Sequence, residues 1–291
     1  LLLTFHITVS TKISALLFTA LLSLVVYKGL RSVDYINRGL MFSKLFTFIL
    51  LALCIFPFIS IDYLLTLANP YSTTMILGSI TVIMTSFGFA VIVPSLRSYF
   101  KNDLLMLRKT ILIGSLIPLF CYVIWEIAIM GVIPAQGNPS LTLMYHSGHS
   151  ASDLMMALSN LLHNRLINLL AKIFTSICLA TSFLGVALSL FDFLSDGLKI
   201  KKRALNKFVL YVLTFLPPFL IANHYPHIFI IALSYAGVLC ALLLILLPAM
   251  MAWSGRYIKK SAIGYRLAGG KFLLISLITI ALFIIVLSLI N

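Results

Sequence analysis

The sequence predicts an all-α, multi-pass membrane protein, and three observations lead to this fold class. Of the 291 residues, 62% are hydrophobic and only 10% are charged, whereas soluble domains are about 45–50% apolar and about 25% charged. The apolar residues gather in eight runs, and a membrane-spanning helix needs roughly 20 such residues. The basic residues gather in alternate connections between the runs. These features exclude a soluble enzyme and a disordered chain.

Each of the eight apolar runs is expected to form one helix. The first and the sixth are short for a span, so we expect interfacial residues to extend them. In chain order, the runs are Ile13–Tyr27, Leu40–Ile59, Met75–Leu96, Ile111–Ile133, Ile173–Leu194, Phe208–Ala222, Ile228–Trp253 and Phe272–Ile290.

The Lys and Arg residues predict the direction of these spans. Of the 21, 18 lie in the connections that follow the first, third, fifth and seventh runs. Because Lys and Arg accumulate on the cytoplasmic side, these connections are predicted to be cytoplasmic and both chain ends to be outside. The net charge of +14 is thus a topology signal that requires no nucleic-acid partner. The cytoplasmic connections are residues 28–44, 97–109, 199–207 and 256–271, and residues 134–166 form an outer loop.

The third run contains signals for a broken helix. Gly88 lies near its middle and Pro94 follows six residues later; both residues weaken helical hydrogen bonding. Within a membrane, a broken helix survives where it is buried in protein or lines a cavity, and transporters bind substrate at such breaks. The segment also offers hydroxyls and aromatic rings, at Thr85, Ser86, Phe87 and Phe89. The alternative is a kinked helix that serves only packing.

Glu126 is the one acidic residue well inside an apolar run. A carboxylate within the membrane is costly and is by default a functional hypothesis. Glu126 is therefore a candidate for proton coupling. The alternatives are a protonated structural residue that bonds to a neighbouring hydroxyl and a residue that reaches an outer vestibule.

The fifth run has small and hydroxyl-bearing residues near its centre, including Thr181 and Ser182. Small residues let helices approach closely, and hydroxyls bond across helices. Both packing and substrate contact remain open for this stretch.

Sequence patterns for metal, cofactor or enzyme chemistry are weak. The four cysteines lie far apart inside apolar runs without a CxxC pair, and His146, His149 and His163 of the outer loop lack Cys or Asp partners at ligand spacing. The sequence has no phosphate-binding GxxxxGK[ST], no GxSxG and no HExxH pattern. We therefore expect no metal, no cofactor and no enzyme activity.

Five stretches resemble the aromatic amino acid permeases, the family of the tyrosine-specific and tryptophan-specific transport proteins of bacteria. The stretch TSFGFAVIVPSLRSYF at 85–100 resembles the sixth helix of that family, and LATSFLGVALSLFDFLSD at 179–196 resembles the eighth. TFLPPFLIANHYP at 214–226 and ALSYAGVLCALLLILLPAMMAWSGR at 232–256 are similar to the ninth and tenth, and GYRLAGGK at 264–271 to the loop before the last. The matches follow in order, and the tyrosine-specific members are the more similar.

The resemblance implies an eleven-helix amino acid–polyamine–cation superfamily fold with an inverted 5+5 repeat. The first run here then corresponds to the fourth helix, so the chain is expected to lack three helices and to hold about eight. Residue 1 is Leu, which agrees with that expectation. Residues 1–74 would be the remainder of the first repeat, 75–253 the second repeat, and 254–291 a basic loop and the last helix.

The resemblance further implies import of tyrosine or a related aromatic amino acid by proton symport, with alternating access at the broken helix. The protein would lie in the bacterial inner membrane, with the lipid bilayer, the amino acid and a proton as its partners. The expected substrate contacts are Thr85, Ser86, Phe87, Gly88, Phe89, Thr181 and Ser182, with Glu126 as the proton carrier. The alternative is an inactive fragment of such a permease; a membrane-embedded enzyme is disfavoured because no cluster of catalytic groups is seen.

Overall fold

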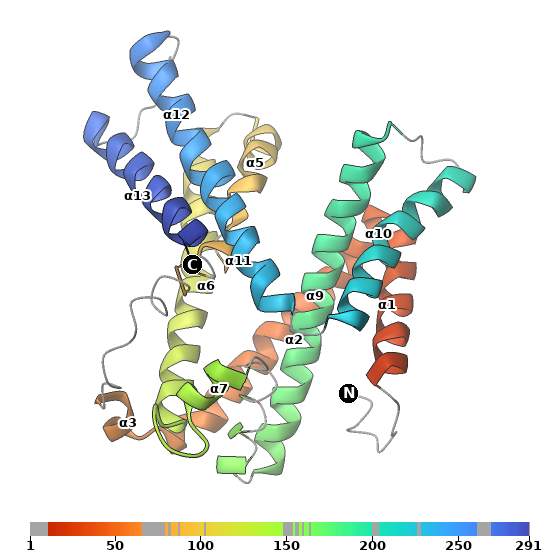
Figure 1. Cartoon of the computed structure of the whole chain (residues 1–291), viewed down its shortest axis with the longest axis vertical. Coiled ribbons are helices and arrows are strands. Elements are labelled where there is room, and N and C mark those ends of the chain that lie inside the picture. The colour runs from red at the N-terminus through yellow and green to blue at the C-terminus, as the bar shows by residue number, and fades with distance from the viewer. Residues whose placement is uncertain are drawn as a thin grey trace. The chain divides into compact units, whose positions relative to one another are not determined.

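Every regular element in the described part of this computed structural model is a helix (Figure 1). The structure describes residues 11–65, 79–80, 83–86, 88–101, 103–147, 154, 157–158, 160–162, 164–199, 204–225, 228–260 and 269–290. The chain forms two compact units: unit 1 comprises Leu1–Thr66 and Ile124–Pro226, and unit 2 comprises Leu67–Val123 and His227–Asn291. The two units are defined by the contacts within each of them and do not test the repeat boundaries predicted above. Those boundaries therefore stay a prediction.

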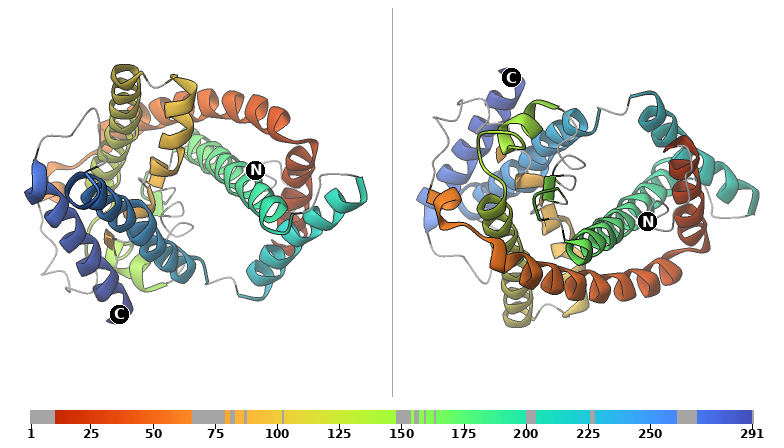
Figure 2. Two further views of the ribbon diagram at one scale, coloured as in Figure 1. Left: turned by 90° about the horizontal axis from the view of Figure 1, so that it is seen from above. Right: turned by 90° about the horizontal axis from the view of Figure 1, so that it is seen from below.

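Unit 1 is built mainly from four long helices, of which α2 and α9 make the most extensive contacts with each other. Its elements are α1 (Thr11–Lys28), α2 (Leu30–Ile55), η2 (Phe56–Phe58), α3 (Ile61–Leu65), the last part of α6 (Leu104–Val132), α7 (Leu141–Ser147), α9 (Arg165–Gly197) and α10 (Ala204–His224). Figure 2 shows α1, α2, α9 and α10 from two opposite sides.

Two apolar clusters hold unit 1 together. One joins α2, α6 and α9 through Leu51, Ile55, Ile133 and Ile167, among others. The other joins α1, α2, α9 and α10, and its most deeply buried members are Val26, Leu184 and Leu210. Lipid tails are as apolar as these side chains, so close van der Waals packing, and not removal from water, is the main force that fixes these helices against one another within the membrane.

Contacts at the helix ends agree with alternate crossing of the membrane within unit 1. The backbone N–H of Ser60, just after α2, donates to the carbonyl of Gly131 near the end of α6 at 2.8 Å. At the ends predicted to be cytoplasmic, the Lys207 Nζ of α10 lies 4.4 Å from the centre of the Tyr27 ring of α1. The two predicted outer connections thus meet each other, as do the two predicted cytoplasmic ones.

Unit 2 contains helices of three backbone types. Its elements are η3 (a 3₁₀ helix, Gly88–Ile92), α5 (Val93–Tyr99), the first part of α6, α11 (Ile228–Cys240), η4 (a π-helix, Ala241–Leu246), α12 (Leu247–Trp253), η5 (a π-helix, Ser254–Ile258) and α13 (Gly270–Ile290). The third predicted run is therefore not one α-helix: residues 83–86 are helical, η3 follows from Gly88, and α5 begins at Val93.

Five helices in the described residues are long and apolar enough to cross a membrane, which supports a multi-pass membrane protein. They cover Leu30–Phe58, Leu104–Val132, Arg165–Gly197, Asn206–His224 and Tyr235–Ile258, and two shorter apolar helices cover Ile13–Lys28 and Gly270–Val286. The count of eight spans stays a prediction, because part of the third run lies outside the described residues.

Several helix starts were predicted too late, and for α6 and α9 a helix cap explains why. The Asn164 Oδ1 accepts from the backbone N–H groups of Leu166 and Ile167, at 2.9 and 3.4 Å, so α9 begins at Arg165 and not near Ile173. Asp103 caps α6 in the same way, at 3.0 and 3.1 Å. A polar side chain that satisfies the first free N–H groups lets a helix start before its apolar run.

Candidate functional site

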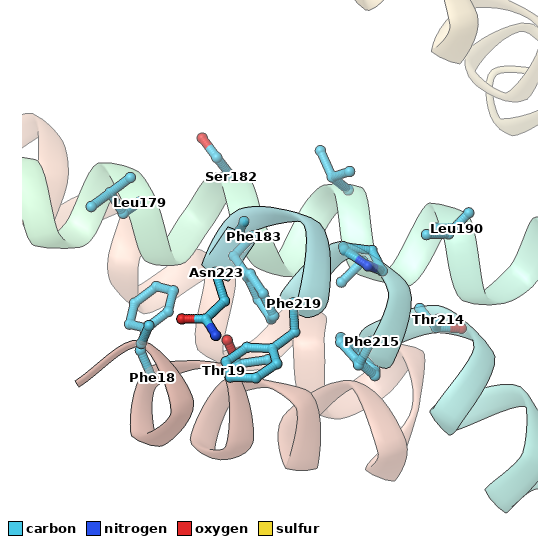
Figure 3. A pocket seen from close by; sticks show the side chains of 15 residues that line it. Phe18, Thr19, Leu179, Ser182, Phe183, Leu190, Thr214, Phe215, Phe219 and Asn223 are labelled. Atoms are coloured by element: carbon cyan, nitrogen blue, oxygen red, sulfur yellow. The ribbon is translucent and has the colours of Figure 1, made fainter. Parts of the chain in front are cut away.

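A cavity of about 670 Å³ lies within unit 1, between α1, α9 and α10. Ligand sites typically occupy roughly 300–1,000 Å³ and have mostly apolar walls with a few polar groups. This cavity has that character, and Figure 3 shows its side chains. Its lining consists of Ala15, Phe18, Thr19, Leu179, Ser182, Phe183, Val186, Ala187, Leu190, Thr214, Phe215, Pro218, Phe219, Ala222 and Asn223.

Four phenylalanines from three helices give the cavity an aromatic wall. Phe183 of α9 lies between two of the others: its ring is 5.6 Å from that of Phe18, edge to face, and 5.9 Å from that of Phe215, stacked. Such aromatic pairs add about 0.5–1.5 kcal/mol beyond the burial of their area. The wall is therefore a connected set of rings, to which Phe219 adds a fourth.

Two consecutive prolines in α10 change the backbone beside the cavity. Pro217 and Pro218 have no N–H, so the carbonyls of Leu213 and Thr214 lose the donor that an α-helix normally provides. The helix nevertheless continues from Ala204 to His224. Neighbouring contacts stabilise proline-containing helices in membrane proteins. The proline pair therefore leaves two carbonyls without their usual α-helical donor, while the helix itself continues.

The predicted contacts Thr181 and Ser182 differ in their surroundings. Thr181 is buried, and its Oγ1 donates to the Cys178 carbonyl of the same helix at 3.0 Å. Ser182 lines the cavity, and Figure 3 shows its side chain projecting from the opposite side of α9 to Phe183. Ser182 therefore belongs to the rim of the cavity, while the Thr181 hydroxyl is already bonded within α9.

The broken segment of unit 2 holds the other predicted contacts. A Cβ atom at Gly88 would lie 3.8 Å from Leu244 Cδ1 and 3.9 Å from Cys240 Sγ, so Gly88 faces the π-helix η4 and the residue before it. Phe89 is partly exposed, Thr85 is half-buried and Ser86 is exposed. Phe87 lies outside the described residues.

The packing of η3 against η4 places two unusual helix types together. In a 3₁₀ helix each N–H bonds three residues back, and in a π-helix five residues back, so both depart from the α-helical pattern. π-Segments occur frequently at functional sites. The pair Gly88–Ile92 and Ala241–Leu246 is therefore the second candidate region, described within unit 2 alone.

The proton-coupling candidate Glu126 is exposed on α6 and makes no ion pair with a described residue. Its orientation follows from its neighbours. Trp125 packs against Phe174, with 5.8 Å between ring centres, and Ala128, Ile129 and Val132 are buried. Because successive residues turn by about 100° around a helix, this buried stripe directs Glu126 away from the core of unit 1.

Some predicted features have no described side chains. His146 lies in α7, but its side chain is outside the description, as are His149 and His163. Among the described residues, no group of three or more His, Cys, Asp or Glu side chains could hold a metal ion.

The sequence reasoning missed Phe18, Thr19, Phe215, Phe219 and Asn223 of the cavity. One available signal was the spacing of Phe215 and Phe219, which puts both rings on one face of a helix around the proline pair. The contribution of α1 carried no such signal, because Phe18 lies in an evenly apolar run.

A family model and several known proteins match this chain, and most of these matches are to transport proteins for tyrosine or tryptophan. Residues 2–288 match the tryptophan/tyrosine permease family. The chain is 35% identical to a tyrosine-specific transport system 2 of Haemophilus influenzae, over 91% of this chain and 64% of that protein. It is 29% identical to a tryptophan-specific transport protein of the same organism, over 89% and 62%.

A third relative is a glutamine transporter 2 of Aliivibrio fischeri, which is 32% identical over 84% of this chain and 60% of that protein. The chain thus spans about three fifths of the length of these relatives. No solved structure matches.

Proposed function

Because this chain belongs to the tryptophan/tyrosine permease family, we propose that it acts in the import of tyrosine or a related aromatic amino acid across the bacterial plasma membrane. The match to tyrosine-specific and tryptophan-specific transport proteins along most of the chain carries this proposal. The aromatic wall of the unit 1 cavity supports it, since a ring-lined site suits an aromatic side chain.

We propose one place of substrate contact in each unit. In unit 2, Thr85, Ser86 and the backbone at Gly88 hold the polar groups of the amino acid, and Phe87 and Phe89 contact its ring. In unit 1, the cavity takes part through Ser182 and its phenylalanines, with Thr181 shaping α9 beside it. Interrupted helices supply polar backbone groups for such contacts, and transport proceeds by alternating access.

The test of substrate class is uptake of radiolabelled tyrosine by cells that express the protein and lack their own aromatic amino acid transport. Saturable uptake that unlabelled tryptophan and phenylalanine reduce is expected. Glutamine is the second candidate substrate, because a relative is named as a glutamine transporter. Uptake of labelled glutamine, with no competition by aromatic amino acids, would replace the first proposal by the second.

The proposed transport is proton symport, with Glu126 as the proton carrier. An isolated carboxylate in a membrane-spanning helix is the group best suited to that role. Glu126→Gln is expected to lower pH-driven uptake at least about tenfold while leaving exchange of bound for free substrate nearly unchanged, because exchange requires no net proton movement. Asp196→Asn, at the exposed end of α9, is the matched control and should change neither. A Glu126→Gln protein with the wild-type pH profile would remove Glu126 from the mechanism.

A further inference from the structure

A sharp corner joins α1 to α2 in unit 1 (Figure 2). Helix α1 ends at Lys28 and α2 begins at Leu30. Gly29 between them has a φ of +106°, a backbone conformation that residues with side chains rarely adopt. The Gly29 carbonyl accepts from the backbone N–H groups of Ser32 and Val33 at 3.1 and 3.2 Å. The corner is therefore a defined turn that fixes the start of α2 relative to the end of α1.

A groove of about 550 Å³ lies along this corner and has two chemically distinct halves. The half along the helices is apolar and is lined by Leu21, Leu24, Val25 and Ile36. The half at the corner is polar and is lined by Lys28, Arg31, Ser32 and Tyr35. Leu21 and Leu24 are 65% and 58% exposed, so the apolar half is an open surface.

The positive charge at the corner is not neutralised by a described acid. The nearest carboxylate in the sequence, Asp34, pairs with Arg38, with 2.8 Å between Oδ2 and Nη2. Lys28 and Arg31 are both exposed, and neither makes an ion pair with a described residue. The polar half of the groove thus holds two cations, a hydroxyl and a phenol, next to the apolar half.

We propose that this groove binds an anionic phospholipid, with the phosphate at Lys28 and Arg31 and an acyl chain along Leu21 and Leu24. The charges are complementary, and guanidinium and ammonium groups are strong donors to phosphate oxygens. Leu21 precedes Lys28 by about two helical turns, or roughly 10 Å. That length suits the step from a headgroup to the upper part of its acyl chain.

The predicted topology puts the groove where such lipids gather. Residues 28–44 belong to a connection that the basic residues predict to be cytoplasmic, and the cytoplasmic leaflet carries the negative surface potential. Tyr35 has the amphipathic ring that is enriched at the membrane–water boundary. This inference is independent of the transported substrate, because the groove shares no residue with the unit 1 cavity.

The experiment measures lipid binding to the purified protein in detergent by native mass spectrometry, with phosphatidylglycerol and phosphatidylcholine of the same acyl chains. Preferential retention of phosphatidylglycerol is expected. The double variant Lys28→Gln/Arg31→Gln should bind it about 25-fold more weakly, from about fivefold for each cation near an anionic lipid. The matched control Lys259→Gln/Lys260→Gln loses the same charge at another exposed site and should retain binding.

Further arms separate the lipid from other occupants of the groove. Leu24→Trp fills the apolar half of the groove and should weaken phosphatidylglycerol binding although Lys28 and Arg31 are both present. Thermal unfolding without lipid serves as the control that each variant is folded. Glycerol phosphate has the headgroup without acyl chains. At a concentration equal to that of phosphatidylglycerol, it should not displace the lipid from the protein. Equal binding of both lipids, equal loss in the two double variants, or full competition by glycerol phosphate would overturn the proposal.

Discussion

Unit 1 and unit 2 are built from similar apolar side chains, but their backbones differ. The helices α1, α2, α9 and α10 of unit 1 are regular over 18 to 33 residues, and α10 remains so through two prolines. Unit 1 has one short 3₁₀ turn, η2, after α2, whereas unit 2 includes a five-residue 3₁₀ segment and two π-segments. Regular helices suit a rigid wall around a cavity, whereas 3₁₀ stretches within helices often mark hinges and π-segments are frequent at functional sites. We therefore expect unit 1 to keep its shape and the η3–η4 region of unit 2 to be the place where the backbone moves.

The hydroxyl groups of unit 1 show how its helices satisfy their own polar atoms. Thr47, Thr175 and Thr214 each donate to the carbonyl four residues earlier, at 2.6, 2.8 and 2.7 Å. Thr181 does the same three residues earlier. A hydroxyl in an apolar helix is therefore not by itself a sign of a ligand contact, because the preceding turn offers an acceptor within reach.

The substitution with the largest expected effect disrupts the tight packing of unit 1. A Cβ atom at Gly131 would lie 2.6 Å from Ile59 Cγ2 and 3.3 Å from Ile59 Cβ. Gly131→Ala therefore forces α6 away from the chain after α2, where the Gly131 carbonyl accepts from Ser60. We expect a loss of about 1–3 kcal/mol of stability, measured by thermal or denaturant unfolding in detergent.

Gly114, in the part of the same helix that belongs to unit 2, is the matched control. A Cβ atom there would meet nothing within 4 Å, so Gly114→Ala should leave stability unchanged or raise it by up to about 1 kcal/mol. Equal destabilisation by the two substitutions would mean that helix α6 is disturbed as a whole, and that close packing at Gly131 is not the cause.

The next effect concerns the 3₁₀ segment η3 of unit 2. An added methyl group at Gly88 would make ordinary contacts with Leu244 and Cys240, so Gly88→Ala should fold normally. It also restricts a backbone that is proposed to move, because alanine has less conformational freedom than glycine. We expect uptake to fall at least about fivefold with thermal stability nearly unchanged. Full uptake by a stable Gly88→Ala protein would make η3 a static feature.

The membrane class and the family could be predicted from the sequence because they depend on signals along the chain. Apolar runs predicted the long helices, and Gly88 with Pro94 predicted an irregular third segment, which the structure has as η3. Helix starts were missed where a single side chain decides them, as at Asn164. The seventh run, predicted as one helix over Ile228–Trp253, is divided by η4, and its even apolar composition gives no sign of the π-turn.

The cavity was harder to predict because its wall combines helices that are far apart in the sequence. Phe18 and Phe183 meet only because α1 packs against α9, and no local pattern encodes that contact. The placement of Thr181 and Ser182 on different sides of α9 follows from helix geometry, but which side faces the cavity depends on the position of α10. The roles of all the predicted contact residues stay predictions.

Replacing a ring of the aromatic wall is expected to have an intermediate effect, which is seen in the KM for tyrosine. Phe18 contacts Phe183 edge to face and lines the cavity, yet it is exposed enough to be replaced without opening the core. Phe18→Leu should raise the KM for tyrosine about two- to tenfold, since an aromatic pair contributes about 0.5–1.5 kcal/mol. Phe193→Leu, at a ring that is 70% exposed and does not line the cavity, should leave the KM unchanged. A shift of equal size in both variants would point to a general effect on folding.

The substitution with the smallest expected effect tests the hydrogen bond between α1 and α10. The Ser23 Oγ donates to the Ala20 carbonyl at 3.0 Å, so the Tyr211 hydroxyl is the donor in the bond between Tyr211 and Ser23. The Tyr211 ring also packs edge to face on Tyr27 and at a tilt on Phe215. Tyr211→Phe keeps these ring contacts and removes one hydrogen bond at a partly buried site.

We expect Tyr211→Phe to lower the free energy of unfolding by about 1 kcal/mol and to leave the KM unchanged, because Tyr211 does not line the cavity. Tyr235→Phe, at an exposed ring of α11, should change neither. Ser23→Ala completes a double-mutant cycle, which isolates the energy of the Ser23–Tyr211 pair from the other contacts of each residue. A coupling energy near zero would show that ring packing, and not this bond, holds α1 against α10. An increased KM in Tyr211→Phe would instead mean that the bond positions the aromatic wall, and unit 1 would then be less rigid than its regular helices indicate.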